Sequence, residues 1–440
     1  RPTIARIAAI ALLAPLFTVS DLPGQMASEA VAAPVTVDGC EVDVTLDNGD
    51  SLADNAIVSI DTATTDDHYV KVGKATGTSD CVLEFVKPDV EMIWNVPDNI
   101  PSLRVLVVAG GGGGSMGGGG AGGMFDSLST LSAADIANIG SQAKIQVGSG
   151  GASRSGSEAK NTTNQGESGN DSWFIGSGDT ASYADTTATA SGSNGESTAP
   201  VIVMKGGGGG GSGDMDPAGD HNFGLTGGSS GGSGRELIFS SPTNPPTDPL
   251  DVAFGNEGGK QFCCSSGRPT PPEGEPKPIY VGAGGGGAGG DPGTDARIWK
   301  TRGGPGGPGK ASDITGEDVT YAEGGAGGAV NRYDGQSTSV VRGTTSHGGG
   351  SGFFERANES GGGGTTSSGG SGGERNTGSG AGAGATVNGP GGSGVVVVRY
   401  GLPAVGPEIT ATTSPTSNGF DIQIANLDSY ESGVTWEADD

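Results

Sequence analysis

The chain is poor both in the residues that build a conventional core and in those that build a catalytic centre. Hydrophobic residues make up 32% of its 440 residues and aromatic residues 5%, too few for one large apolar core of this length. The 3 histidines, His68, His221 and His347, form no cluster, and the 4 cysteines lack the CxxC spacing of a zinc site. We therefore expect no metal and no cofactor.

Positive charge is also scarce, with 23 Lys and Arg residues against 50 Asp and Glu residues and a net charge of −27. Such a surface repels the phosphates of nucleic acids and anionic membranes, and it favours solubility in salty water. We expect no nucleic-acid partner.

Long apolar runs are missing as well. The run Ile7–Val19 contains Pro15 and is shorter than the roughly 20 residues of a membrane helix. It follows the basic residues Arg1 and Arg6 and precedes the small residues Ala30–Ala32, which is the order of a secretory signal. We expect a cleaved signal peptide at residues 1–32, no stable membrane insertion after its cleavage, and a secreted or cell-surface protein.

Export permits disulfides. Cys40 and Cys81 lie in the same segment before the glycine-rich tract and are candidates for a bridge within it. Cys263 and Cys264 are adjacent, so they form a strained vicinal disulfide, pair with another chain, or stay reduced.

Glycine is what the chain has in excess. Most of its 90 glycines lie between Gly110 and Gly394, in runs that include Gly110–Gly114, Gly117–Gly120, Gly206–Gly211, Gly284–Gly287 and Gly361–Gly364. Such a tract is either a disordered linker or a structure whose packing unit is the backbone. Collagen is excluded because glycine does not recur strictly at every third residue.

Two β-branched runs favour the ordered alternative. Leu103–Ala109 and Val395–Tyr400 bracket the tract and are typical of strands buried on both faces. If they pair, the two ends of the tract meet. Between them we expect helices of the polyproline-II type, with three residues per turn and hydrogen bonds between neighbouring helices that glycine allows to approach closely.

The fold class expected is therefore mainly β and irregular, with little α-helix after the signal peptide. Residues 33–102 alternate like strands and predict a small antiparallel β module. Residues 103–402 form the glycine-rich domain, with polar loop insertions near 153–200 and 236–277. Residues 403–440, with strand-like Gly419–Ile424 and Trp436, resemble the truncated start of an immunoglobulin-like or fibronectin-type-III-like module.

Several aromatic residues lie in or beside the polar interruptions of the glycine tract. They either cover edges of the bundle and anchor loops, or contact a ligand, since loops on rigid scaffolds are where binding concentrates. The candidate binding-loop aromatics are Trp173, Phe174, Phe239, Phe262, Trp299, Phe353 and Phe354.

The order of motifs from Glu84 to Leu402 resembles the bacterial and phage glycine-rich domain found in tail-fibre-tip adhesins and secreted surface proteins. The resemblance rests on Trp94–Pro97, the strand Arg104–Val108, the runs Gly110–Gly114 and Gly117–Gly123, and the closing segment Gly391–Tyr400. It implies a bundle of polyglycine-II helices whose variable loops recognise a receptor, and it implies no catalytic role.

We accordingly expect a non-enzymatic, adhesin-like binding module whose partner is an extracellular glycan or protein. One alternative is a purely structural spacer or matrix component. A second is an enzyme of the glycoside hydrolase type, which needs two converging carboxyl groups in a cleft.

Overall fold

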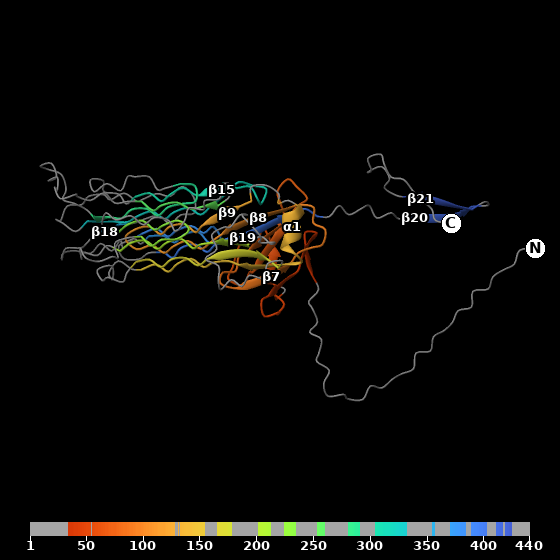
Figure 1. Ribbon diagram of the computed structural model, residues 1–440, viewed down its shortest axis with the longest axis horizontal. Coiled ribbons are helices and arrows are strands. Elements are labelled where there is room, and N and C mark those ends of the chain that lie inside the picture. Colours follow the sequence, from red (N-terminus) through yellow and green to blue (C-terminus); the bar gives the residue numbers. More distant parts are fainter. Residues whose placement is uncertain are drawn as a thin grey trace, which may run out of the picture. The chain divides into compact units, whose positions relative to one another are not determined.

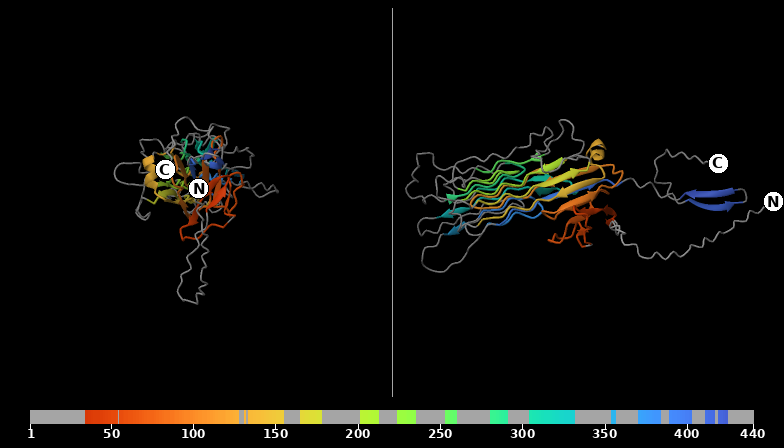
Figure 2. Two further views of the ribbon diagram at one scale, coloured as in Figure 1. Left: turned by 90° about the vertical axis from the view of Figure 1, so that its right-hand side faces the viewer. Right: turned by 60° about the horizontal axis from the view of Figure 1, so that its bottom comes forward.

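The computed structural model describes residues 34–53, 55–127, 131, 133–154, 165–177, 201–212, 224–234, 253–259, 280–290, 304–331, 354–356, 370–383, 389–402, 411–416 and 419–424 (Figures 1 and 2). These residues are mainly β, as predicted, with one short helix, α1 (Ala133–Ile139). No helix among them is long and apolar enough to cross a bilayer. The expected signal peptide, Cys263, Cys264 and Trp436 lie outside the described residues.

Two sheets pack face to face. The seven-stranded sheet has the order β13 (Ala253–Phe254), β9 (Met124–Asp126), β8 (Leu103–Val108), β19 (Val395–Tyr400), β6 (Cys81–Phe85), β5 (Val70–Lys74) and β4 (Ile57–Ser59). The five-stranded sheet has the order β12 (Val201–Met204), β11 (Ser172–Gly176), β10 (Gln142–Gln146), β7 (Glu91–Asn95) and β3 (Val44–Leu46). All neighbouring pairs are antiparallel except β4 and β5.

The two bracketing strands pair as predicted, along the whole register from Val395↔Val108 to Tyr400↔Leu103. Their continuous apolar sequence has a simple cause. On β8, Val105 and Val107 face the main core between the sheets, whereas Leu106 and Val108 belong to a second apolar cluster on the other face. Strands buried on both faces need apolar residues at every position.

Residues 33–102, predicted as a separate module, contribute strands to both sheets. Strand β6 pairs with β19, with Cys81 opposite Tyr400, and β7 pairs with β10. The predicted disulfide is present: Cys40 in β2 (Cys40–Val42) and Cys81 in β6 are fully buried, with their Cα atoms 5.7 Å apart. The first region and the glycine-rich region therefore share one core.

Shorter strands complete the described structure. β1 (Val35–Val37) pairs with β2, and β15 (Lys310–Ser312) forms a hairpin with β16 (Val319–Tyr321). β14 (Tyr280–Val281), β17 (Ala329–Asn331) and β18 (Phe354–Arg356) form a three-stranded sheet. β20 (Ala411–Thr416) and β21 (Gly419–Ile424) form a hairpin, and β21 is the strand predicted at those residues.

The glycine segments run side by side from the ends of the sheets (Figures 1 and 2). Several are direct continuations of strands, as at the end of β8 and the start of β19. We call them the glycine bundle, which comprises residues 109–123, 148–154, 165–170, 205–212, 224–234, 255–259, 282–290, 304–309, 322–328, 370–383 and 389–394.

Hydrogen bonds in the glycine bundle repeat every three residues. Successive N–H groups of residues 117–123 donate in rotation to three segments, 205–211, 283–286 and 378–381. Gly117, Gly120 and Gly123 bond to the first segment, Gly118 and Ala121 to the second, and Gly119 and Gly122 to the third, with N···O distances of 2.8–3.0 Å. A three-residue period is that of a polyproline-II helix, as predicted for this tract.

The carbonyl groups of residues 117–123 accept hydrogen bonds from other segments. The donors are residues 109–115, residues 229–232 and Gly325, so the central segment has six neighbours. A Cβ at Gly119 would lie 2.0 Å from the carbonyl oxygen of Gly112, and one at Gly118 would lie 2.0 Å from that of Gly325. Only glycine permits this approach, because the neighbouring backbone occupies the place of a side chain.

Candidate functional site

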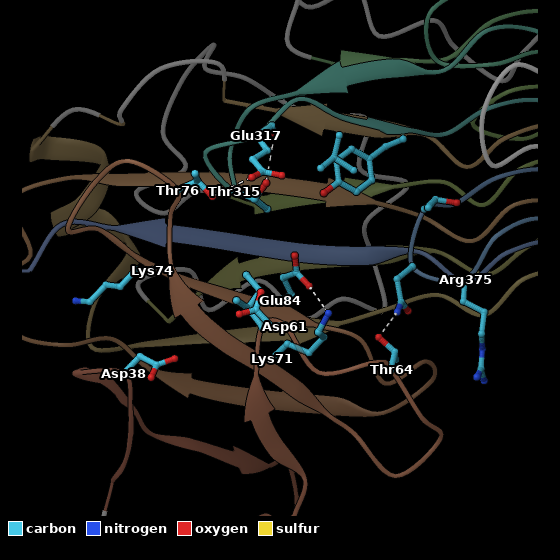
Figure 3. A pocket seen from close by; sticks show the side chains of 15 residues that line it. Asp38, Asp61, Thr64, Lys71, Lys74, Thr76, Glu84, Thr315, Glu317 and Arg375 are labelled. Atoms are coloured by element: carbon cyan, nitrogen blue, oxygen red, sulfur yellow. Dashed lines mark hydrogen bonds and ion pairs between the residues drawn. The ribbon is translucent and has the colours of Figure 1, made fainter.

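A polar pocket of about 600 Å³ lies on the outer face of the seven-stranded sheet. Its walls come from four separate parts of the chain: the turn between β1 and β2, the region of β4–β6, the β15–β16 hairpin, and the turn at residues 375–377. We call it the β5–β16 pocket. Figure 3 shows its lining in a view that runs from Asp38 and Lys74 at one side to Arg375 at the other.

The β15–β16 hairpin is attached to the sheet by its turn. The Thr76 amide donates to the carbonyl of Thr315 at 3.0 Å, and the Thr76 hydroxyl donates to Glu317 at 3.4 Å (Figure 3). Gly316 has a φ of +90°, and a Cβ there would lie 2.4 Å from the Thr76 nitrogen. Position 316 therefore requires glycine for two reasons: the turn needs a positive φ, and the backbone of Thr76, at one side of the pocket, leaves no room for a Cβ.

The opposite side is held by the turn at residues 375–377. The Asn376 side-chain amide donates to the Thr64 hydroxyl at 3.3 Å, and Arg375 forms an ion pair with Asp66. The Asn376 amide oxygen accepts from Ser393, which precedes β19. This turn thus connects the glycine bundle to the edge of the seven-stranded sheet.

The floor of the pocket carries a partly buried ion pair on facing strands. Lys71 of β5 lies opposite Glu84 of β6, and their charged groups are 3.5 Å apart, with side chains 15% and 18% exposed. Burial raises the pKa of Glu84, and the Lys71 ammonium opposes that rise.

Tyr321, at the end of β16, is 4% exposed and contributes to both the pocket and the second apolar cluster. Burial, followed by the charges of Glu84 and Asp126, raises the pKa of its phenol. It therefore stays protonated at physiological pH, as a hydrogen-bond donor and acceptor. Within the described residues its hydroxyl forms no hydrogen bond.

Two residues beside the pocket have unusual backbone conformations. Ala322 has a φ of 54° and Asn376 a φ of 60°, in the left-handed region that non-glycine residues seldom adopt. The Ala322 amide donates to the carbonyl of Thr377 at 2.7 Å, which joins the two segments. Such conformations persist only where the surroundings enforce them, and they concentrate at functional sites.

The predicted binding-loop aromatics lie in different parts of the structure, and several lie outside the described residues. Trp173 and Phe174 do not lie in a loop: they belong to β11, where they are 7% and 0% exposed. The prediction for these two is corrected, because the short apolar run around them forms a strand in the five-stranded sheet. Phe354 has its backbone in β18, and Phe239, Phe262, Trp299 and Phe353 lie outside the described residues.

The pocket residues were not singled out by sequence. A signal was nonetheless present, since Glu84 is the one charged residue of the otherwise apolar strand β6, and Lys71 lies between two valines in β5. Their pairing depends on the register of β5 and β6, which is a tertiary feature. Among the described side chains, no group of three or more His, Cys, Asp or Glu is arranged to hold a metal ion.

Comparison with known proteins finds a similarity over one part of the chain. A protein-family model described as a glycine-rich domain matches residues 87–235. No curated protein matches the chain. The glycine bundle extends beyond the matched range, because residues 283–286 and 378–381 accept hydrogen bonds from residues inside it.

Proposed function

We propose that the chain is a secreted or cell-surface, non-enzymatic binding module in which the glycine bundle is a rigid platform. The observation that supports this is the bundle's hydrogen bonding, which uses backbone groups from segments far apart in the sequence. We propose that the stretches between those segments, such as residues 235–252 and 260–279, are the variable parts that recognise the partner. Variable stretches on a rigid scaffold suit recognition of a partner.

The partner class proposed is an extracellular glycan or protein receptor. The net charge of −27 disfavours anionic partners such as nucleic acids. The 440-residue chain, immobilised on beads, should be retained on a subset of extracellular proteins and glycans. Shortening residues 235–252 and 260–279 should abolish retention without changing the unfolding temperature.

The rival functions give different results in the same experiment. A purely structural spacer is retained on none of the surfaces, whatever the length of the two stretches. A glycoside hydrolase releases reducing sugar ends from the glycans, and release that disappears in a Glu84→Gln variant would overturn the non-enzymatic proposal.

We further propose that residues 403–440 are the first strands of an immunoglobulin-like or fibronectin-type-III-like module. The β20–β21 hairpin supports this, because such modules begin with antiparallel strands. Burial of Trp436, measured by fluorescence quenching in a chain extended beyond residue 440, tests it; free access of quencher to Trp436 would contradict it.

A further inference from the structure

We infer that the β5–β16 pocket binds a neutral, polyhydroxylated ligand of the size of a mono- or disaccharide. The inference rests on the proposed binding function and adds to it a location and a ligand class. The pocket volume of about 600 Å³ falls within the range of small-molecule sites, roughly 300–1,000 Å³.

The charges around the pocket disfavour an ionic ligand of either sign. The lining contains charged side chains of both signs: the basic Lys71, Lys74 and Arg375, and the acidic Asp38, Asp61, Glu84 and Glu317. Most of the basic groups have partners already. Lys71 pairs with Glu84, Arg375 pairs with Asp66, and Lys74 donates to the carbonyl of Ser79 at 3.1 Å. A ligand of either net charge would meet several lining groups of its own sign as well as groups of the opposite sign, so the lining offers no purely complementary charge.

Neutral hydroxyl groups suit this lining better, because they donate to carboxylates and accept from ammonium, hydroxyl and amide groups at once. Thr64, Thr315 and Thr377 supply hydroxyls, and Asn376 supplies an amide. Apolar surface comes from Ile60, Val319 and the ring of Tyr321. A sugar ring has the same combination of a C–H face and a hydroxylated rim.

Two groups have hydrogen-bonding capacity left for such a ligand. The Tyr321 hydroxyl belongs to a side chain that is 4% exposed, yet it forms no hydrogen bond within the described residues. Asp61 is exposed at the pocket and forms no hydrogen bond or ion pair within the described part of the chain. Asp61 is exposed, and the Tyr321 hydroxyl is not one of the fully buried, unpaired atoms of the described side chains. Both groups can therefore bond to a ligand that displaces water.

The pocket is also pre-formed. The left-handed conformations at Ala322 and Asn376, joined through Thr377, fix its walls through the glycine bundle before any ligand arrives. Pre-organised walls reduce the ordering cost of binding.

The test measures binding of the full chain to an array of neutral mono- and disaccharides (glucose, galactose, mannose, N-acetylglucosamine and their disaccharides), with sialylated and sulfated sugars beside them. We expect binding to a subset of the neutral sugars. Tyr321→Phe, which removes one hydroxyl, and Asp61→Ala should each weaken it about tenfold, as loss of one or two hydrogen bonds does. Tyr69→Phe and Asp98→Asn, which alter residues outside the pocket lining, should bind as the unaltered chain does.

Unchanged unfolding temperatures of Tyr321→Phe and Asp61→Ala establish that both variants fold. Sugar binding that survives in both variants but disappears when residues 235–252 and 260–279 are shortened overturns the pocket and leaves the binding function standing. Preference for the sialylated or sulfated sugars overturns the neutral ligand class. Absence of binding to every sugar overturns the inference, and the bead experiment then decides the binding function separately through protein receptors.

Discussion

At the scale of the residue, glycine in this protein acts as a packing unit rather than as a source of flexibility. Gly117–Gly123 are fully enclosed by other backbone segments, and their N–H groups all have acceptors. Each glycine pays a large conformational entropy cost when it is ordered. That cost is offset by main-chain hydrogen bonds, which need an approach that no other residue allows.

A single methyl group should therefore be strongly destabilising inside the bundle. We expect Gly119→Ala, whose Cβ would lie 2.0 Å from the Gly112 carbonyl oxygen, to lower the free energy of unfolding by about 3 kcal/mol or more, as overpacking does. Gly290→Ala is the matched control, because its Cβ would meet only Pro308 side-chain atoms, at 3.5 Å and beyond. Equal unfolding temperatures for the two variants would contradict backbone packing.

Glu84 should make stability depend on pH. Burial raises its pKa in the folded state above the ordinary value of 4.5, so the folded chain holds this proton more tightly than the unfolded chain. The corresponding stabilisation is complete below that ordinary value and is lost as pH rises through the folded-state pKa. The free energy of unfolding of Glu84→Gln minus that of the unaltered chain should therefore be larger at pH 7 than at pH 4. Chemical denaturation at both pH values measures this, and a pH-independent difference would refute it.

At the scale of the element, the bundle is a set of extensions of strands. β8 passes into residues 109–115, and residues 389–394 pass into β19, so pairing of these two strands sets the starting register of the bundle. The sheets supply side-chain burial, which the glycine segments lack. We infer that order spreads from the sheets into the bundle.

Hydrogen exchange tests order in the bundle directly. Amides of Gly117–Gly123 and Gly206–Gly211 should exchange far more slowly than those of an unstructured peptide, because they are buried and most donate to carbonyls of other segments. Amides of β8 are the internal reference for the core. Exchange of the glycine amides at random-coil rates would mean that the tract is a flexible spacer.

The disulfide links β2, which belongs to the small two-stranded sheet, to β6, an inner strand of the seven-stranded sheet. It closes a loop of 41 residues, for which chain-entropy arguments give a stabilisation of about 4 kcal/mol. We expect a double variant, Cys40→Ala with Cys81→Ala, to unfold at a lower denaturant concentration by that free energy. An unchanged midpoint would show that β1 and β2 add little to the cooperative unit.

At the scale of the whole molecule, the first hundred residues and the glycine-rich region depend on each other. β19 lies between β8 and β6, so removal of β6 exposes one edge of the closing strand. The main core likewise contains Leu83, Phe85, Met92 and Trp94 from the first region. Neither region can bury its apolar faces alone.

This dependence predicts the behaviour of fragments. Residues 34–402 should unfold in one cooperative transition, whereas residues 103–402 should aggregate or lack a cooperative transition, because they lose three strands of the seven-stranded sheet and two of the five-stranded sheet. Calorimetry and size-exclusion chromatography of the two fragments measure this. A well-folded 103–402 fragment with the same unfolding temperature would establish two independent domains.

Much of the fold was predictable because it depends on local composition. The β-branched runs at Leu103–Ala109 and Val395–Tyr400 predicted paired, doubly buried strands, and the glycine runs between them predicted a backbone-packed bundle of threefold period. The same approach failed at Trp173 and Phe174, because their apolar run was short and lay between polar stretches. Only pairing of β11 with β10 and β12 identifies it as a strand.

The sequence by itself determined the composition of the bundle, the two closing strands and the availability of Cys40 and Cys81 for a bridge. The tertiary structure alone decided which segments are neighbours, that residues 33–102 share the core, and that Lys71, Glu84, Asp61 and Tyr321 line one pocket. The physical reason is the range of the interactions involved. Side-chain type and chain conformation are local properties, whereas a pocket depends on the register of strands and hairpins that are hundreds of residues apart.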